Sequence, residues 1–453
     1  MSKIQFDLTE GRILNKLLII SGPIMATQLF QMAYNLIDMF FVGSISYEAV
    51  AATGAAGMFM WLSVAFFVIG SMGASIGVSQ NKGRGDMATA KKFAQNSLLV
   101  ALILGLVYAV IVIIKAPTFI SWLGIREEHV IADAALYLRI IALSFPMLFA
   151  NNAITGAFNG SGNSGFPFKL KMIGLVINVI ISPILIFSLN MGIMGAAIAT
   201  GCGYIITGLL LIFAMKSKKY SPFDGFSFVE IFKPDKTIIK QIFKWTLPVA
   251  IENASFTILT MVVTNFTASF GAVAIATKQI GVQMVSMTFL IAGGYAQAFT
   301  SFVGQNYGAG KMQRIKKGFN ISIGLMISWG SIVTLVLVVF GASFYRLFTS
   351  NPLIIASGVR YLRIVAFVQI ITCIEMLCTG TFRGFGKTTP PLIASVTFNT
   401  LRIFIAFGLS QTPLGLYGVF IGEAIGVFLR GSTIYIWYSI FSRRFLKKQE
   451  VCA

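Results

Sequence analysis

Four carboxyl groups lie inside long apolar stretches of this 453-residue chain, where an ionised group is costly to hold. They are Asp38, in the segment "YNLIDMFFVG", and Glu252, Glu375 and Glu423 in the C-terminal half. A membrane carboxylate without a partner can bind and release H⁺ or Na⁺, whereas one beside an Arg or Lys forms a structural ion pair. These four residues are therefore the first candidates for chemistry within the membrane.

The two halves differ in the basic residues that could neutralise these carboxylates. In the apolar stretches of the N-terminal half we place one basic residue, Arg139, near an outer end from which it could extend to the interface. We therefore expect Asp38 to couple transport to an ion. The C-terminal half offers Lys278, Arg363, Arg402 and Arg430. For its three glutamates, ion pairing and ion binding both stay open.

The stretches around these residues are long enough to cross a membrane. The chain is 56% hydrophobic and 11% charged, whereas soluble proteins are about 25% charged. Runs of about 20 apolar residues, the length of a membrane-spanning helix, recur through the chain. We place twelve, near 16–42, 52–79, 94–114, 132–155, 170–188, 192–214, 243–268, 273–302, 319–345, 358–381, 391–410 and 415–440. Lipid offers no partner to an open backbone, so we expect an all-α polytopic membrane protein.

The net charge of +20 follows from the placement of Lys and Arg relative to these spans. With a cytoplasmic N-terminus, only Lys115, Arg126 and Arg346 of the 35 basic residues fall in outside loops. This asymmetry obeys the positive-inside rule and indicates contact with anionic lipids rather than with nucleic acid. We predict a multi-pass protein of the plasma (inner) membrane with both termini in the cytoplasm.

The two halves of the sequence repeat one another. At a shift of 225 residues Pro23 matches Pro248, and "QNKGRG" (80–85) matches "QNYGAG" (305–310). At a shift of 224 "YLRIIA" (137–142) matches "YLRIVA" (361–366). Six spans per half give both halves the same orientation. We predict two parallel six-helix lobes, 1–215 and 241–453, joined by a cytoplasmic linker, 216–240, around a central substrate cleft.

Two glycine-rich segments look like nucleotide-binding motifs. They are "GSGNSG" (160–165) and "GFGKTT" (384–389), and each matches the other in the repeat. Neither follows a strand, and the second lacks the phosphate-loop spacing because residue 381 is Thr. We interpret both as tight turns. Without an ATP-binding module, transport must be driven by an ion gradient.

The sequence resembles the MATE family of multidrug and toxin extrusion transporters over essentially its whole length. The resemblance is carried by the two parallel halves, by Pro23, Tyr34 and Asp38 of span 1, and by the paired Q-N-x-G-x-G loops. It implies a multidrug efflux antiporter that exchanges H⁺ or Na⁺ for organic, mostly cationic amphipathic compounds by alternating access. The expected protein is a monomer in the lipid bilayer, with no enzyme activity and no cofactor.

The resemblance also implies an ion site in the N-terminal half. In prokaryotic members the span 1 aspartate acts with an Asn and an Asp of span 5 and a Thr of span 6. Here Asn178 and Thr200 match the Asn and the Thr, but Ser182 stands where the Asp would be. A neutral hydroxyl removes one formal charge, so Na⁺ binding at Asp38, Asn178 and Thr200 should weaken more than protonation of Asp38.

Other residues carry expected roles. Tyr34 and Tyr137 match tyrosines that line the family's cavity, and Pro23 matches the proline at which span 1 can bend. Glu423 matches no residue of the family, but we expect it in the substrate cavity as well. Members with a second acidic site use carboxylates of spans 7 and 10. Glu252 and Glu375 lie in those spans, about one turn from the matching positions.

Two alternatives remain beside the exporter. A lipid-linked oligosaccharide flippase of the same superfamily usually has fourteen spans and a basic cavity, and twelve spans with an acidic cavity argue against it. A membrane-embedded enzyme would need a nucleophile with a partnered base. The single histidine, His129, lies in an outside loop beside Glu127 and Glu128.

Overall fold

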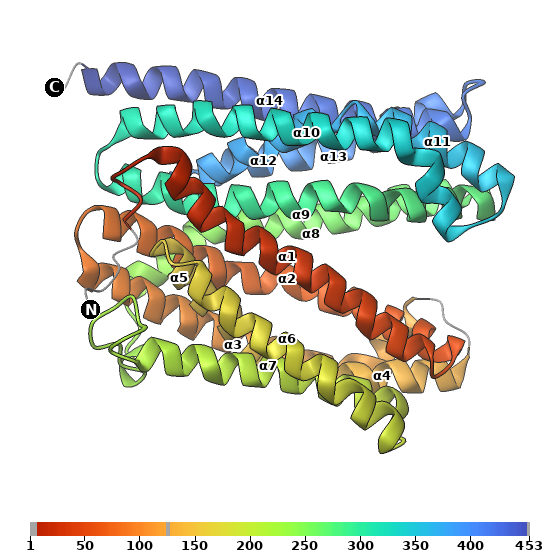
Figure 1. Cartoon of the computed structure of the whole chain (residues 1–453), viewed down its shortest axis with the longest axis horizontal. Helices are drawn as coiled ribbons and strands as arrows, with labels where there is room; N and C mark the ends of the chain where they lie inside the picture. The colour runs from red at the N-terminus through yellow and green to blue at the C-terminus, as the bar shows by residue number, and fades with distance from the viewer. Residues whose placement is uncertain (1–6, 124–126, 451–453) are drawn as a thin grey trace. The chain divides into compact units, whose positions relative to one another are not determined.

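The computed structural model describes residues 7–123 and 127–450, and the regular structure within them is helical (Figure 1). Arg126 and both ends of the chain, to which predictions above refer, lie outside these residues. The N-terminal helices are α1 (Ile13–Gly43), α2 (Tyr47–Gly83), α3 (Met87–Ser121), α4 (Glu128–Ala142), α5 (Phe145–Gly160), α6 (Gly165–Pro183), the π-helical turn η1 (Ile184–Ser188) and α7 (Gly192–Lys216). They are followed by η2 (Val229–Phe232), α8 (Lys236–Ala268), α9 (Ala272–Gly308), α10 (Met312–Phe348), α11 (Pro352–Ala366), α12 (Gln369–Gly384), α13 (Thr389–Ser410) and α14 (Leu416–Glu450).

The number of spans agrees with the sequence. Ten helices are long and apolar enough to cross a membrane, and two bent pairs bring the number to twelve. The prediction of an all-α polytopic protein is therefore confirmed.

Spans 4 and 10 differ from the continuous helices that hydropathy predicts. The helices α4 and α5 are bent by 50°, and α11 and α12 by 46°. Pro146, in the first turn of α5, lacks an N–H and cannot continue α4. The second bend has no proline, but the side chain of Gln369 donates to the carbonyl of Val365 (2.8 Å) and so takes a backbone acceptor. Side-chain donors of this kind let a broken helix lie inside a membrane protein.

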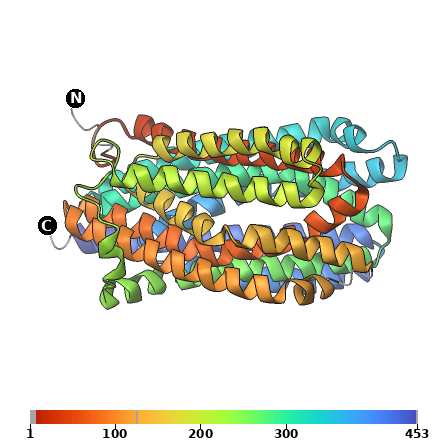
Figure 2. The same ribbon diagram turned by 90° about the horizontal axis from the view of Figure 1, so that it is seen from below.

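The chain forms two compact units. Unit 1 contains residues 18–250, with 1–11 and 304–310, and unit 2 contains residues 12–17, 251–303 and 311–453. In unit 1, α2 packs against α3 and α5, and α6 lies beside α7 (Figure 2). In unit 2, α13 packs against α14, and α10 packs against α11 and α12.

The internal geometry of the two units repeats as the sequence does. Gly192 and Gly415, at the starts of α7 and α14, both have positive φ, 52° and 50°. Added Cβ atoms on Gly195 and Gly418 would meet the backbones of Leu185 and Leu409, respectively. These matches give a shift of 224 between α6 and α13 and of 223 between α7 and α14.

The two nucleotide-like segments are tight turns, which confirms that interpretation. Gly162 and Gly386 have φ of 87° and 71° after the ends of α5 and α12. Asn163 donates its N–H to the carbonyl of Phe158 (3.0 Å) in the first turn. Lys387 donates to Phe382 (2.9 Å) in the second. Both are helix C-terminal caps that need a left-handed residue.

The segment between α7 and α8 is attached to α3. The Gln95 side chain donates to the carbonyl of Ser227 (3.1 Å) and to the carboxylate of Glu230 (2.8 Å). Asn96 accepts the N–H of Asp235 (2.9 Å), and Lys91 lies 3.7 Å from Glu230. This segment therefore belongs structurally to unit 1.

The paired Q-N-x-G motifs meet one another within unit 1. A Cβ on Gly83 would overlap the backbone carbonyl of Gln305, and a Cβ on Gly308 would overlap that of Gln80. The glycines are needed because two helix ends approach backbone to backbone.

Candidate functional site

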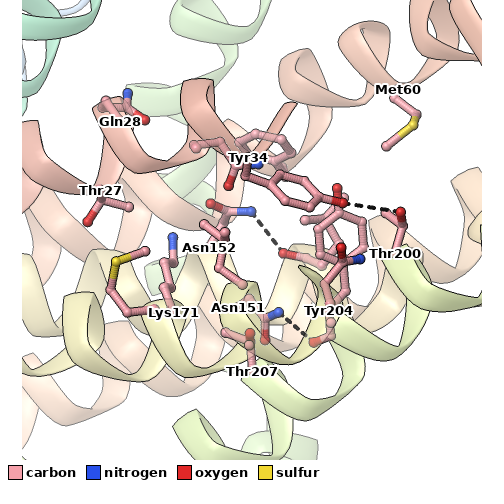
Figure 3. A pocket seen from close by; sticks show the side chains of 18 of the residues that line it. Thr27, Gln28, Tyr34, Met60, Asn151, Asn152, Lys171, Thr200, Tyr204 and Thr207 are labelled. Atoms are coloured by element: carbon pink, nitrogen blue, oxygen red, sulfur yellow. Dashed lines mark hydrogen bonds between the residues drawn. The ribbon is translucent and has the colours of Figure 1, made fainter. Parts of the chain in front are cut away.

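Unit 1 encloses a cavity of about 280 Å³ between α1, α2, α5, α6 and α7 (Figure 3). Its wall is rich in neutral polar groups. The amides are Gln28, Gln31, Asn151, Asn152 and Asn178, and the hydroxyls are Thr27, Tyr34, Ser63, Thr200, Tyr204 and Thr207. Among the described residues that line it, Lys171 alone carries a charge.

Helical spacing brings these side chains to one side of each helix. On α1, Thr27, Gln31 and Tyr34 follow at intervals of four and three residues, which is one face of a helix. On α7, Thr200, Tyr204 and Thr207 do the same. The apolar spans therefore carry polar stripes turned toward the cavity rather than toward lipid.

Two hydrogen-bonded pairs lie at the predicted ion site, and three of their four residues line the cavity. The hydroxyls of Tyr34 and Thr200 share a hydrogen bond of 3.2 Å. Ser182 donates to the side-chain oxygen of Asn178 at 3.1 Å. All four side chains are buried, so each pair satisfies polar groups that would be costly if left without a partner.

Asp38 lies one turn after Tyr34 on α1, and it differs from these pairs. Its carboxylate acts electrostatically on the hydroxyls of Tyr34, Tyr137 and Tyr204. One carboxylate oxygen is buried and has no hydrogen-bond partner among the described residues. Asp38 therefore lies beside Tyr34, which bonds to Thr200, and no basic residue pairs with its carboxylate within the described part of the chain.

The two remaining predicted residues of unit 1 are Tyr137 and Pro23. Tyr137 is buried near Asp38 but does not line the cavity. Pro23 lies within a continuous α1, and its carbonyl accepts the hydroxyl of Thr27 at 2.8 Å. Bending at Pro23 stays a prediction.

The three glutamates within the apolar spans of unit 2 are all in ion pairs. Glu252 pairs with Arg383 (2.9 Å), and Glu423 pairs with Lys278 (2.9 Å). Glu375 accepts from Arg430 (2.9 Å), whose other nitrogen donates to Asn399 (2.9 Å). Of the two readings that the sequence left open, these contacts support the structural ion pair. Glu423, expected in a substrate cavity, lies in this paired set.

A fourth buried base completes the set. Arg402 donates to the hydroxyl of Thr260 (2.8 Å) and interacts electrostatically with Glu423. The guanidinium groups of Arg402 and Arg430 lie 5.7 and 6.0 Å from the centre of the Phe256 ring. Unit 2 therefore holds a cluster of three carboxylates and four bases, in which three bases are paired with carboxylates and Arg402 donates to a hydroxyl.

One expectation from the sequence is corrected here. Arg139 is not the one basic residue within the spans of the N-terminal half, because Lys171 lies in α6. The helix begins at Gly165, before the apolar run expected from residue 170, so Lys171 is in its second turn rather than at its edge. Lys171 and Asn178 are seven residues apart and so lie on one face of the helix. This spacing could have indicated from the sequence that Lys171 faces the cavity.

Comparison with known proteins shows which family and which solved structures this chain resembles. The family model MatE matches residues 23–184 and 248–407. A "Probable multidrug resistance protein NorM" of Thermotoga maritima is 26% identical over 94% of this chain and 92% of the relative. The "Multidrug export protein MepA" of Staphylococcus haemolyticus is 26% identical over 98% of both chains. A structure described as the "outward-facing conformation of a multidrug resistance MATE family transporter of the MOP superfamily" superimposes with a TM-score of 0.92. It is 22% identical and covers 98% of this chain and 99% of that one.

Proposed function

This chain belongs to the MatE family, and on that premise we propose that it is a multidrug efflux transporter driven by protons that bind Asp38. Its full-length relatives are named as multidrug resistance or export proteins. Such a protein carries small molecules across a membrane and is a transporter rather than an enzyme. The polar cavity of unit 1 is the proposed substrate site.

One observation carries the coupling proposal, namely the buried carboxylate oxygen of Asp38 that has no hydrogen-bond partner among the described residues. An ionised carboxylate in this position costs free energy, and binding a proton removes that cost. Because Asp38 neighbours Tyr34, a wall residue, its protonation would change the field felt by a bound substrate.

The surrounding groups favour H⁺ over Na⁺. Sodium requires several oxygens directed at one point and is helped by carboxylate charge, whereas Ser182 offers only a neutral hydroxyl, which donates to Asn178. Across the described residues, no cluster of three or more His, Cys, Asp and Glu side chains is arranged to hold a metal ion. A single carboxylate with neutral, mutually bonded neighbours is suited to a proton.

We further propose the substrate class and the setting. The cavity wall combines Met60, Phe67 and Met172 with amides, which suits amphipathic organic molecules that have a flat apolar body, cations among them. The protein is proposed to act as a monomer in the plasma (inner) membrane with cytoplasmic termini, as the distribution of Lys and Arg indicates.

One of the two arguments against a lipid-linked oligosaccharide flippase is weaker in the structure, and the other still holds. The acidic cavity that argued against it is absent from unit 1, and Lys171 supplies one basic group. The span count still opposes it, since the family's flippases usually have fourteen and this chain has up to twelve. The named relatives also favour export.

The test is export of ethidium from proteoliposomes under separate H⁺ and Na⁺ gradients, with wild type, Asp38→Asn and a control, Asp133→Asn. Asp133 is a carboxylate of α4 outside the cavity wall. We expect the pH gradient to drive export by wild type and by the control but not by Asp38→Asn. Export by Asp38→Asn at the wild-type rate would make Asp38 structural, and export driven by Na⁺ alone would overturn proton coupling.

A further inference from the structure

We infer that the cavity of unit 1 binds molecules that carry an acidic group, and that Lys171 is the residue that recognises it. This deepens the proposed export function and rests on it for the direction of transport, but the binding step stands by itself. The ligand class is a zwitterion or organic anion with an apolar ring system and a carboxylate, sulfonate or phosphate.

The position of Lys171 is the first support. Its side chain extends from α6 into the space between Thr27 and Asn152 (Figure 3). No ion pair or hydrogen bond to its amine occurs among the described residues. An ammonium group has three donors and no acceptor, so it requires an oxygen from elsewhere.

The contrast with other buried bases in this chain is the second support. Lys278, Arg383 and Arg430 each have a glutamate within 2.9 Å, and Arg402 has a hydroxyl. A membrane cation is usually paired in this way. Lys171 breaks the pattern at the one place where a ligand could take the partner's role.

Extension of Lys171 to the membrane surface is the simpler explanation, and its neighbour shows what that looks like. Lys169 lies two residues earlier on α6, is exposed and does not line the cavity. Two residues turn a helix by about 200°, so the two amines leave opposite sides of α6. Lys169 is therefore placed to reach water, and Lys171 is placed to reach a ligand.

The distribution of charge along the cavity sharpens the ligand class. Lys171 and Asn178 are two helical turns apart, about 10 Å along α6. Thr27 and Lys171 lie at one end of the cavity, and the Tyr34–Thr200 pair, beside Asp38, lies at the other (Figure 3). A molecule with its acidic group at Lys171 and a basic group directed toward Asp38 would satisfy both.

The experiment uses a matched pair of dyes, rhodamine 110, which has a free carboxylate, and rhodamine 123, its methyl ester. Binding to the purified full-length protein is measured by fluorescence anisotropy without any gradient. The variants are Lys171→Met, which keeps length and removes charge, Lys171→Arg, which keeps charge, and Lys169→Met as the matched control. Size-exclusion profiles and thermal unfolding report whether each variant is folded.

We expect wild type, Lys169→Met and Lys171→Arg to bind the acid, and Lys171→Met to bind it about tenfold or more weakly, as loss of a charge-assisted contact predicts. Binding of the ester should change little in Lys171→Met, which shows that this variant is folded. Equal loss of acid and ester, unchanged acid binding by Lys171→Met, or no acid binding by wild type would each overturn the inference. Selective acid binding without gradient-driven export would instead leave the inference standing and refute the proposed transport.

Discussion

The two units place different chemistry at the same positions of one repeat. Asn178 of unit 1 corresponds to Arg402 of unit 2, and Gly203 and Gly426 pack against their Cβ atoms in the same way. Thr200 corresponds to Glu423. Asp38 corresponds to Val263, which is buried in an apolar cluster with Ala406, the counterpart of Ser182. Unit 1 holds a carboxylate that has no basic partner within the described part of the chain, whereas unit 2 has an apolar cluster at the matching positions and Arg402 at the position of Asn178.

The same replacement extends through the cavity wall. A Cβ atom on Gly208 would contact Asn151, and one on Gly431 would lie near Glu375. The pair Gly208–Asn151 is therefore equivalent to the pair Gly431–Glu375. By the same shifts, Thr27 corresponds to Glu252 and Thr207 corresponds to Arg430. Neutral groups around a cavity thus match charged groups that pair with each other. Charges within a membrane are stable when they pair with one another, as in unit 2. Charges without such a partner, as in unit 1, are candidates for binding ligands and ions.

The largest expected effect tests whether the charges of unit 2 are structural. Glu375→Gln leaves Arg430 without its carboxylate, which should lower the free energy of unfolding by about 3–5 kcal/mol. The double variant Glu375→Gln with Arg430→Gln should recover most of the loss, since no uncompensated charge remains. Thermal unfolding in detergent measures both. Wild-type stability of the single variant would show that Glu375 is not structurally paired.

The next prediction transfers a feature of unit 2 into unit 1. Asn178→Arg copies Arg402, and Gly203 leaves space beside it as Gly426 does beside Arg402. The new guanidinium should pair with Asp38 and hold it ionised, and 1.4 kcal/mol of such stabilisation reduces proton-driven export about tenfold. Asn178→Gln, which adds no charge, is the control. Equal export by Asn178→Arg and Asn178→Gln would show that a charge at position 178 does not act on Asp38.

A third prediction compares two substitutions of a carboxylate by an amide, which should change the stability in opposite directions. Asp38→Asn removes a carboxylate without a basic partner, so we expect stability to rise at pH 7, by about 1 kcal/mol, the scale of one buried unsatisfied polar group. Glu375→Gln lowers it, as stated above. Both are followed by thermal unfolding of the same preparation. A fall in stability for Asp38→Asn would reveal a structural partner of this carboxylate.

The smallest effect concerns charges in water, at the segment 217–235. The hydrogen bond from Gln95, followed by the charge of Lys91, lowers the pKa of Glu230 below its ordinary value of 4.5. A lowered pKa means that this contact stabilises the attached segment above pH 4.5 and is lost as the pH falls further. Gln95→Ala removes two hydrogen bonds, about 1 kcal/mol each.

Hydrogen exchange of residues 217–235 should therefore increase in Gln95→Ala at pH 7 and in wild type at low pH. Thr89→Ala, on the same helix but away from this segment, serves as the control. Unchanged exchange in Gln95→Ala would mean that other contacts hold the segment to α3.

Hydropathy predicted the spans because they depend on local composition, and residue matches at fixed shifts revealed the repeat. Asp38 was found because a charge in hydrocarbon is conspicuous. Lys171 was not counted within a span because it stands at the second position of the predicted run 170–188, whereas α6 begins at Gly165 and places it in the second turn. Arg383 was missed as the partner of Glu252 because the two are 131 residues apart, and their pairing depends on how helices pack. The bend between α11 and α12 has no proline to signal it.

The reciprocal contact of the Q-N-x-G motifs has a consequence for the origin of the chain. Gly83 meets Gln305 as Gly308 meets Gln80, so each segment takes the role of the other. An interface with this property is isologous, the type formed by two identical subunits about a twofold axis. A six-helix ancestor could therefore have assembled as a homodimer through this seam, and gene duplication with fusion would have required no new surface there. Covalent linkage then allowed the copies to diverge, one pairing its membrane carboxylates with bases and the other retaining Asp38 and Lys171.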